Sequence, residues 1–482
     1  MDQVSVSRRR ALAALAGATA AAAQRPARLV RPGPTGKEGP APGGEPPAGA
    51  SPGPPAPPAR RGPNIIFILA DDLGYGDLGC YGQQQIQTPN LDRLAAQGTR
   101  FTDCYAGSTV CAPSRCCLMT GLHTGHCWVR GNALVPLRRT ETTVASVLKR
   151  AGYTTGLIGK WGLGEPDTPG VPTRQGFDEF FGYLNQVHAH DYYPDYLWRN
   201  ETQVPLPANE QRARRWYSND LFADEVEAFV RRHAARPFFL YLSYTLPHAN
   251  NERGKEGMEV PTDAPYGDRA WPPAQRNHAA MITRLDGYVG RLLDQLRALK
   301  LENDTLVFFT SDNGPHREGG ADPQFFASSG PLRGIKRDLY EGGIRVPMLA
   351  RWPGKVPAGK VSPVPWAFWD FLPTAAELTG LKPPEGLDGA SVAPLLTGGE
   401  PPKRSHFYWE FHERGFHQAV RTGDWKAIRH GLKGPVELYD LSKDLGERQD
   451  VAAANPTVVE SVTKILAEAR TESERFPVRE AR

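Results

Sequence analysis

Long hydrophobic runs are absent from this sequence, and so is a charge excess of one sign. The longest stretch of small apolar residues covers positions 11–23 and has 13 residues, whereas a membrane-spanning helix needs roughly 20. The 57 basic residues nearly balance the 53 acidic ones and leave a net charge of +4. These absences exclude a membrane-embedded protein and give no sign of a nucleic-acid partner. A chain of 482 residues is long enough for one large globular domain and a smaller one.

Cysteine is scarce and confined to one part of the chain. The 355 residues after position 127 contain none. The six cysteines are Cys80, Cys104, Cys111, Cys116, Cys117 and Cys127. A disulfide scaffold spreads its cysteines more widely, and no CxxC pair suits a zinc–thiolate site. The clustering predicts local chemistry, together with one or two short disulfide bridges.

The first 23 residues have the three parts of a cleavable export signal. The arginines at 8–10 precede an Ala/Leu stretch, which ends in small residues at 21–23. Paired arginines before a weakly apolar stretch are typical of the bacterial twin-arginine route and predict a periplasmic or secreted protein. Residues 24–63 contain 13 Pro and 8 Gly in 40 positions, which predicts an extended or disordered linker.

The rest of the chain alternates strand-like and helix-like segments, the pattern of an α/β domain over 64–402. Buried strands are expected at 64–70, 153–158, 237–243 and 306–310, and helices at 89–97 and 281–299. Over 403–482 the segments are short and aromatic. Strands are expected there at 406–411, 418–421, 425–429 and 437–439, with a helix at 456–473. This predicts a small antiparallel sheet covered by a helix.

Each buried strand of the α/β domain is followed by polar side chains. In chain order these are Asp71 and Asp72, then Lys160, then His248, then Asp312 and Asn313. Ligands of an open parallel sheet bind beyond the carboxyl ends of its strands. We therefore expect the four clusters to converge on one site.

The segment 111–121, CAPSRCCLMTG, is the most specific in the chain. Pro113 suits the first position of a helix and Gly121 suits its end, which places Cys111 just before a helix N-terminus. The free N–H groups of that end favour an anion, and Arg115 adds a fork of donors. The residues alone indicate an activated thiolate or an anion-binding nucleophile.

This segment resembles the signature of the type I sulfatases, Cys-x-Pro-Ser-Arg followed by Leu-x-Thr-Gly, at every fixed position. The resemblance continues through 71–72, 159–161, 311–314 and 340–343. It implies an alkaline-phosphatase-like core, with a mostly parallel central sheet flanked by helices and a smaller C-terminal antiparallel sheet plus helix. In that family a separate maturation enzyme converts the motif cysteine to formylglycine, an aldehyde that is hydrated in the resting site. The resemblance implies this modification at Cys111.

Oxygen donors at the strand ends indicate a hard divalent metal. The donors are Asp71, Asp72, Asp312 and Asn313, and a hydrated aldehyde at Cys111 would add another. Such a set suits Ca²⁺ or Mg²⁺ better than zinc, and the resemblance favours Ca²⁺ over Mg²⁺.

The resemblance also implies a covalent mechanism for the hydrolysis of a sulfate ester. One hydroxyl of the hydrated formylglycine attacks the sulfur, while Arg115, Lys160 and Lys336 stabilise charge on the sulfate oxygens. His248 protonates the departing alcohol. The second hydroxyl then loses its proton and sulfate is expelled. An unmodified cysteine or serine has no second hydroxyl and could not carry out this step.

The sequence departs from the family pattern at one position. A histidine normally follows the Lys-Trp pair and contacts the formylglycine hydroxyl, but this chain has Gly162 there. Either His188, His190 or His316 supplies the missing imidazole, or the space beside the glycine admits more substrate. The sequence does not decide between these alternatives.

The expected substrate is a sulfated polysaccharide or oligosaccharide, with aryl sulfates as artificial substrates. The aromatic and basic residues of 188–199 either stack on sugar rings or form a packed core. Two other functions stay open. One is a phosphodiesterase or phosphonate hydrolase of the same superfamily, because sulfate and phosphate esters are similar in shape. The other is a non-catalytic protein that binds sulfated glycans. This alternative is considered because Gly162 replaces the histidine of the family pattern.

Overall fold

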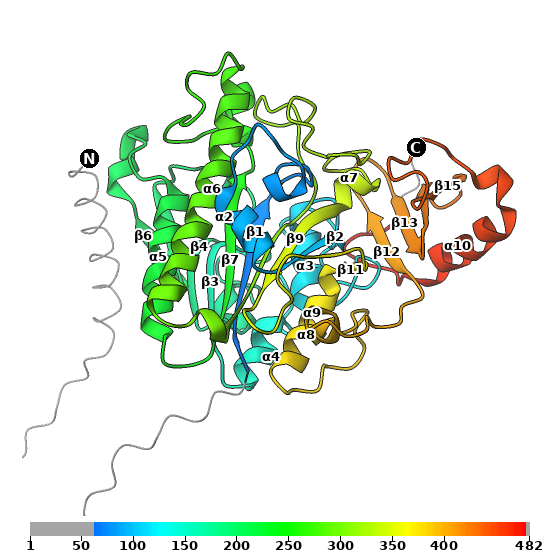
Figure 1. Ribbon diagram of the computed structural model, residues 1–482, viewed down its shortest axis with the longest axis horizontal. Helices are drawn as coiled ribbons and strands as arrows, with labels where there is room; N and C mark the ends of the chain where they lie inside the picture. The colour runs from blue at the N-terminus through cyan, green and yellow to red at the C-terminus, as the bar shows by residue number, and fades with distance from the viewer. Residues whose placement is uncertain (1–61, 479–482) are drawn as a thin grey trace, which may run out of the picture. The chain divides into compact units, whose positions relative to one another are not determined.

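The molecule is built on one large mixed sheet, shown in the computed structural model of Figure 1, which describes residues 62–478. The predicted export signal and nearly all of the predicted linker lie outside the described residues. The strands of this sheet are β1 (Asn64–Asp71), β2 (Thr99–Tyr105), β3 (Thr154–Lys160), β4 (Glu179–Tyr183), β5 (Tyr196–Arg199), β6 (Thr202–Pro205), β7 (Phe238–Pro247), β8 (Thr305–Ser311), β9 (Arg345–Arg351), β10 (Lys360–Ser362) and β11 (Trp366–Ala367). The accompanying helices are α2 (Pro89–Ala96), α3 (Cys111–Thr120), α4 (Val144–Arg150), α5 (Ser218–His233), α6 (Pro273–Ala298), α7 (Glu341–Ile344), α8 (Phe371–Leu378) and α9 (Ala393–Leu396).

The centre of the main sheet is parallel. The strands lie in the order β10-β2-β9-β8-β1-β7-β3-β4-β5-β6, with β11 beside β2. β8, β1, β7, β3 and β4 run parallel, whereas β9 and β5 are antiparallel to their inner neighbours. Every residue of β1 is buried, because this strand has neighbours at both edges and helices over both faces. That position explains its continuous apolar sequence.

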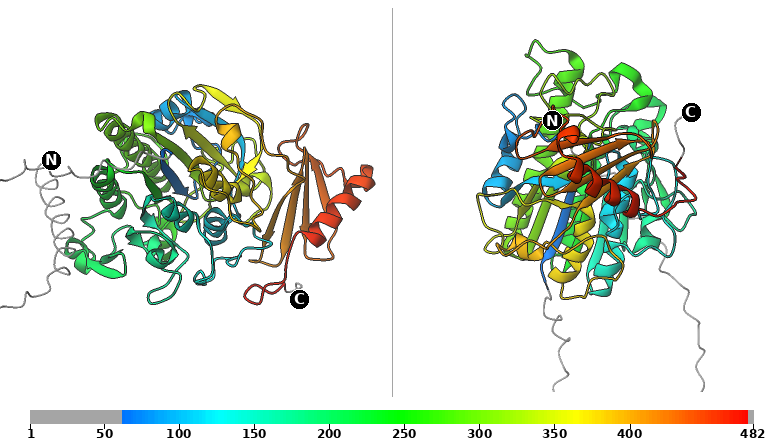
Figure 2. Two further views of the ribbon diagram at one scale, coloured as in Figure 1. Left: turned by 90° about the horizontal axis from the view of Figure 1, so that it is seen from below. Right: turned by 90° about the vertical axis from the view of Figure 1, so that its right-hand side faces the viewer.

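Two groups of helices cover the sheet. On one face α3 and α4 pack against α8, and the ring of Phe67 in β1 lies 4.5 Å from that of Phe371 in α8. On the other face α2 and α5 pack against α6, and both α5 and α6 contact β7 (Figures 1 and 2). The N-terminal turn of α3 lies at the carboxyl ends of the central strands, where Cys111 contacts Asp71.

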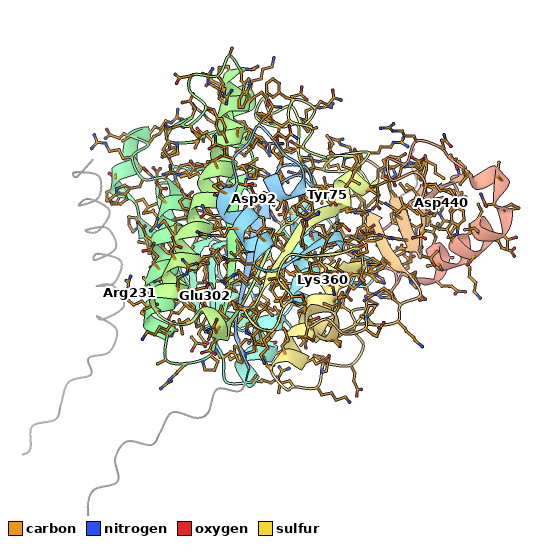
Figure 3. The ribbon with its side chains drawn as sticks, viewed as in Figure 1. Tyr75, Asp92, Arg231, Glu302, Lys360 and Asp440 are labelled. Atoms are coloured by element: carbon orange, nitrogen blue, oxygen red, sulfur yellow. The ribbon has the colours of Figure 1, made fainter. Side chains whose placement is uncertain are left out.

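The C-terminal part forms a second, four-stranded sheet. Its strands β12 (Phe407–Phe411), β13 (His417–Thr422), β14 (Trp425–His430) and β15 (Val436–Asp440) are antiparallel, and α10 (Pro456–Glu468) packs across them (Figure 2). Glu410 of β12 pairs with Arg130 of the α/β part at 2.8 Å. The indole of Trp409 donates to the carbonyl of Ala106 at 3.0 Å. Figure 3 marks Asp440 at the end of β15 and Lys360 in the edge strand β10.

The predicted fold class is confirmed, and each predicted strand is present, but two helix boundaries were wrong. α6 begins at Pro273 rather than at 281, because its first turns bury polar side chains such as Gln275 and His278 that carry no apolar periodicity. α10 ends at Glu468 rather than at 473.

The predicted disulfide bridges are also wrong. All six cysteines lie within the described residues and are free. The Sγ atoms of Cys117 and Cys127 approach to 3.9 Å, which is well beyond a bonded distance. No helix within residues 62–478 is long and apolar enough to cross a membrane.

Candidate active site

Cys111 is the first residue of α3, a helix whose residues are all buried. The sequence predicted Cys111 just before the helix with Pro113 at its first position. Instead Val110 is the extended residue that precedes the helix, and Pro113 is the third helical residue. Gly121 ends α3 with a φ of +72°, the left-handed conformation that favours glycine.

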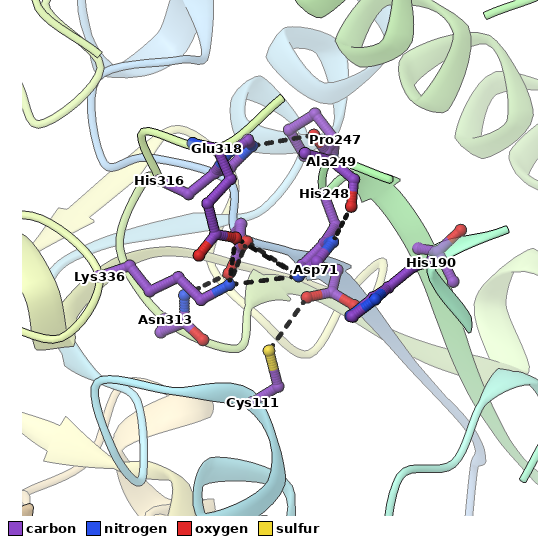
Figure 4. Close-up of polar contacts among 12 residues, drawn as sticks. Asp71, Cys111, His190, Pro247, His248, Ala249, Asn313, His316, Glu318 and Lys336 are labelled. Carbon is purple, nitrogen blue, oxygen red and sulfur yellow. Dashed lines mark hydrogen bonds and ion pairs between the residues drawn. The ribbon is translucent and has the colours of Figure 1, made fainter. Parts of the chain in front are cut away.

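The thiol of Cys111 is protonated in these surroundings. Its Sγ donates to Oδ1 of Asp71 at 3.4 Å (Figure 4). Burial and the negative charge of Asp71 raise the pKa of the Cys111 thiol well above its ordinary value. Both effects disfavour the thiolate of the unmodified residue, against the activated-thiolate interpretation.

Arg115 lies one turn after Cys111 and is completely buried. Its guanidinium donates to Oδ2 of Asp312 at 2.7 and 3.1 Å and to the carbonyl of Lys160 at 3.0 Å. It also lies 3.3 Å from Oδ2 of Asp71. These partners come from the ends of β8, β3 and β1, so the guanidinium is fixed at the carboxyl edge of the sheet.

Two buried lysines add further positive charge. Nζ of Lys160 lies 2.7 Å from Oδ2 of Asp71, and Nζ of Lys336 lies 2.8 Å from Oδ2 of Asp72. Burial alone would raise the pKa of Asp71, but the charge of Lys160 holds it well below its ordinary value. Together with Arg115, these ammonium groups suit a ligand that carries negative charge on several oxygen atoms.

The ends of β1 and β8 form a cluster of oxygen atoms that fits a hard cation. The main-chain N–H of Asp72 donates to Oδ1 of Asp312 at 3.0 Å, and Nδ2 of Asn313 donates to Oδ1 of Asp72 at 2.7 Å. Oδ1 of Asn313 is buried and has no hydrogen-bond partner among the described residues. Burial and the charge of Asp71 raise the pKa of Asp312 to about 7. An unpartnered amide oxygen beside three carboxylates matches the donors that Ca²⁺ prefers.

His248 follows β7 and lies between two other imidazoles (Figure 4). Its Nδ1 donates to the carbonyl of Ala249 at 2.6 Å, and its Nε2 accepts from Nζ of Lys336 at 3.2 Å. Its ring lies 4.9 Å from that of His190, nearly parallel at 10°, and 5.9 Å from that of His316. Burial and the charge of Lys336 hold the pKa of His248 well below its ordinary value, so the ring is neutral.

The structure separates the three histidines considered for the missing imidazole. His190 and His316 stack on His248. His188 instead packs against Tyr183 and Tyr196, so its inclusion among the site residues was wrong. Its place in the chain is close to His190, but its ring turns to the aromatic core.

Two of the aromatic residues of 192–199 are packed in the interior, whereas Tyr193 and Tyr196 are partly exposed. Tyr192 is buried and stacks on Tyr217. Trp198 is also buried. Arg199 pairs with Glu225 at 2.7 Å. The packed-core alternative is therefore confirmed for these side chains, and the sugar-stacking alternative is not.

Gln186, which the sequence reasoning missed, fills the space beside Gly162. Gly162 has a φ of +79°, and a Cβ built on it would lie 2.6 Å from Nε2 of Gln186 and 3.6 Å from Cδ of Arg115. A larger side chain at this position would be strained by the backbone and would displace the amide of Gln186. The room left by the glycine holds protein, so the expectation of extra space for substrate is wrong.

Glu318 is a second residue that the sequence reasoning missed. It accepts from Lys336 at 3.1 Å and from Arg337 at 2.6 Å. Burial alone would raise the pKa of Glu318, but the charge of Lys336 lowers it to about 2. Glu318 therefore ties Lys336 to its neighbour Arg337. The only sequence signal for Glu318 was its position two residues after His316.

Comparison with known proteins identifies the family. A model of the sulfatase family matches residues 63–381, and a model of the C-terminal region of N-sulphoglucosamine sulphohydrolase matches residues 335–474. The chain belongs to the sulfatase family.

The relatives of this sulfatase resemble it over most of their length. Arylsulfatase A of Homo sapiens is 36% identical over an alignment of 472 positions, which covers 84% of this chain and 87% of the relative. N-acetylgalactosamine-6-sulfatase of Canis lupus familiaris is 32% identical and covers 86% of this chain and 81% of the relative. The crystal structure of Ps i-CgsB in complex with k-i-k-neocarrahexaose has a TM-score of 0.75 at 30% identity, over 85% of this chain and 94% of the other. The protein is a sulfatase, an enzyme that hydrolyses sulfate esters.

Proposed function

We propose that this sulfatase removes sulfate from a sulfated carbohydrate through a formylglycine formed from Cys111. The observation that carries the proposal is the position of Cys111 beside Asp71, among the buried cations of Arg115 and Lys160. The protonated thiol is a poor nucleophile there. A hydrated aldehyde in the same place would offer two hydroxyl groups to the same surroundings.

In the proposed reaction, one hydroxyl of the hydrated formylglycine loses its proton and attacks the sulfur of the bound ester. The bond between sulfur and the carbohydrate oxygen breaks, and that oxygen takes up a proton and leaves as an alcohol. The second hydroxyl then loses its proton and forms the aldehyde double bond. Sulfate leaves with the electron pair of the other C–O bond, and water restores the hydrate.

The buried cations bind the sulfate group and stabilise its charge. Arg115, Lys160 and Lys336 already point at the carboxylates around Cys111. Because Asp312 holds the guanidinium of Arg115 on two bonds, little reorganisation is needed when charge develops on the sulfate oxygens.

His248 and Lys336 deliver the proton to the leaving alcohol. Nε2 of His248 accepts from Nζ of Lys336 at 3.2 Å, and the carbonyl of Ala249 fixes the other ring nitrogen. Nε2 is therefore the nitrogen from which His248 can protonate the alcohol, while the bond at Nδ1 keeps the ring in its orientation.

We infer that Asp71, Asp72, Asp312 and Asn313 would hold a divalent metal, with Ca²⁺ favoured over Mg²⁺. The support is the set of carboxylates with one buried, unpartnered amide oxygen, whereas Mg²⁺ usually keeps several water ligands. When bound, such an ion lowers the pKa of a hydroxyl in contact with it and balances negative charge on the sulfate.

The carbohydrate substrate is supported by the relatives and by the rim of the site. N-acetylgalactosamine-6-sulfatase carries a sugar in its name, and the Ps i-CgsB structure contains k-i-k-neocarrahexaose. At the rim, Nδ1 of His190 lies 3.0 Å from the exposed carboxylate of Glu252. We propose that His190 contacts the sugar, while His316, which is buried and bonded to the carbonyl of Pro247, supports His248 from behind.

The proposed function is tested by comparing three substrates with the formylglycine-bearing protein. We expect sulfate release from 4-nitrocatechol sulfate and from sulfated oligosaccharides, with little hydrolysis of bis(4-nitrophenyl) phosphate. A strong preference for the phosphate diester would replace the proposal by the phosphodiesterase alternative. Tight binding of sulfated oligosaccharides without sulfate release would replace it by the glycan-binding alternative.

We further propose that residues 1–23 direct export of the folded protein after a formylglycine-generating or equivalent maturation enzyme has acted on Cys111. The support is the sequence of the signal, with its arginines at 8–10. Replacing these arginines by lysine should retain the protein inside the cell, as fractionation would show. Unchanged export of the lysine variant would contradict the twin-arginine route.

A further inference from the structure

The side-chain amide of Gln186 is a buried hydrogen-bond donor without an acceptor. Gln186 is 7% exposed, and its Nε2 has no hydrogen-bond partner among the described residues. The chain offers a contrast in Gln175, whose Nε2 donates to the carbonyls of Arg138 and Pro169. A buried donor that stays unpaired lowers stability, so an unpaired one beside an active site calls for a partner that the free protein lacks.

Gln186 lies beside the reaction centre. A Cβ at Gly162 would be 2.6 Å from Nε2 of Gln186 and 3.6 Å from Cδ of Arg115. Arg115 in turn lies 3.3 Å from Asp71, the carboxylate that accepts from Cys111. The amide therefore packs beside the arginine that flanks the residue proposed to react.

The chain around Gln186 leads from the site to solvent. Leu184 accepts from the main-chain N–H of Gly162 at 2.9 Å, which ties this segment to the end of β3. The next residue, Val187, is 54% exposed. Gln186 thus lies between the buried cations and the surface of the protein.

We propose that Gln186 is a substrate-binding residue that donates a hydrogen bond from Nε2 to an oxygen of the bound sulfate ester. The inference rests on the proposed function and names a recognition group for it. Gly162 serves this role by leaving the space that the amide needs. An amide does not ionise between pH 4 and 10, so this contact would hold the ester without exchanging a proton.

The test compares side chains of equal length at position 186. Gln186→Met removes the donor and keeps the volume, whereas Gln186→Glu keeps the shape and presents only acceptors. The readouts are kcat/KM for 4-nitrocatechol sulfate and the inhibition constant of inorganic sulfate, measured on protein of known formylglycine content. Gln175→Met is the control for loss of a buried glutamine amide.

We expect Gln186→Met to lower kcat/KM and to weaken inhibition by sulfate, each by about tenfold or more, with no loss of thermal stability. Gln186→Glu should lose more, because its negative charge repels the ester. Gln175→Met should lower the unfolding temperature with little effect on sulfate inhibition. Sulfate inhibition within twofold of wild type in Gln186→Met, or full activity in Gln186→Glu, would overturn the inference.

A second test compares the effect of Gly162→Ala in the wild-type protein and in the Gln186→Ala variant, so that a folding defect caused by the change at position 186 is present on both sides of one comparison. Gly162→Ala should weaken sulfate inhibition because its Cβ displaces the amide, and this effect should shrink when Gln186→Ala has already removed the amide. Equal effects of Gly162→Ala in both backgrounds would contradict the proposed role. A wild-type protein that carries formylglycine and hydrolyses no sulfate ester would instead refute the proposed function, and this inference with it.

Discussion

Nζ of Lys336 donates a hydrogen bond to Nε2 of His248 at 3.2 Å and forms an ion pair with Oδ2 of Asp72 at 2.8 Å. The imidazole is neutral, since burial and the lysine charge lower its pKa. Its Nδ1 proton is held by the carbonyl of Ala249, so Nε2 is the atom that can receive a proton and pass it on. The proposed proton transfer to the leaving group therefore runs through Nε2 of His248, the nitrogen that faces Lys336.

Replacement of His248 by Asn should affect substrates according to their leaving group. A carbohydrate alcohol needs a proton to leave, so its release should fall by about 10²–10⁴-fold. A nitrophenolate leaves without a proton, so hydrolysis of 4-nitrophenyl sulfate should fall much less. Steady-state kinetics with both substrates measure the difference, and equal losses would remove His248 from proton delivery.

Replacement of Cys111 by Ala should abolish turnover and leave the fold intact, because the smaller side chain fits at the start of α3. Cys117→Ala is the matched control, since Cys117 is another buried, free cysteine of the same helix. Activity assays and thermal unfolding of both variants provide the measurement. A Cys111→Ala protein with more than about a hundredth of wild-type activity, a barrier change under ~2.7 kcal/mol, would contradict the covalent mechanism.

Replacement of Asn313 by Ala should weaken calcium binding by about tenfold or more, because it removes a buried oxygen that has no hydrogen-bond partner within residues 62–478. Asn64→Ala is the control. Asn64 is a buried asparagine at the opposite end of β1, and its side chain is bonded to Thr305 and Phe238. Calorimetric titration with Ca²⁺ alone tests both variants. Unchanged affinity in Asn313→Ala would exclude Asn313 from the metal ligands.

Glu410 should make the stability of the enzyme depend on acid pH. Burial alone would raise the pKa of Glu410, but His412 and Arg130 lower it from 4.5 to about 2. The folded state thus favours the ionised form by about 3 kcal/mol. This stabilisation is present above the unfolded value of 4.5 and is lost as the pH falls toward 2.

Denaturant unfolding of Glu410→Gln at several pH values tests this point. The variant should be less stable than wild type at pH 7, and the difference should shrink toward pH 3. Glu201→Gln is the control, because Glu201 pairs with Arg174 on the surface, where an ion pair contributes little. A difference between Glu410→Gln and wild type that does not change with pH would contradict the explanation.

The central sheet and most of the site could be predicted from the sequence for one physical reason. The carboxyl ends of adjacent parallel strands meet, so Asp71, Lys160, His248 and Asp312 had to lie together once four apolar strands were found. The helix start at Cys111 followed to within a residue or two from Pro113 and Gly121.

Other parts of the site depend on burial and on loop paths, which no local pattern records. Burial and the charge of Asp71 raise the pKa of the Cys111 thiol, and neither effect could be read from the position of Cys111 at a helix terminus. Gln186 and Glu318 reach the site from segments without strand or helix periodicity. His188 was wrongly included because its closeness in sequence to His190 does not fix the direction of its ring.

The central claim, that Cys111 becomes the formylglycine of this sulfatase, is tested most directly by the mass of tryptic peptide 101–115 from protein made in its own host. That peptide also contains Cys104, which serves as an internal thiol. The account predicts a mass in which one CH2SH group is replaced by CHO, with a single cysteine left to alkylate. A peptide with two alkylated thiols from active enzyme would contradict it.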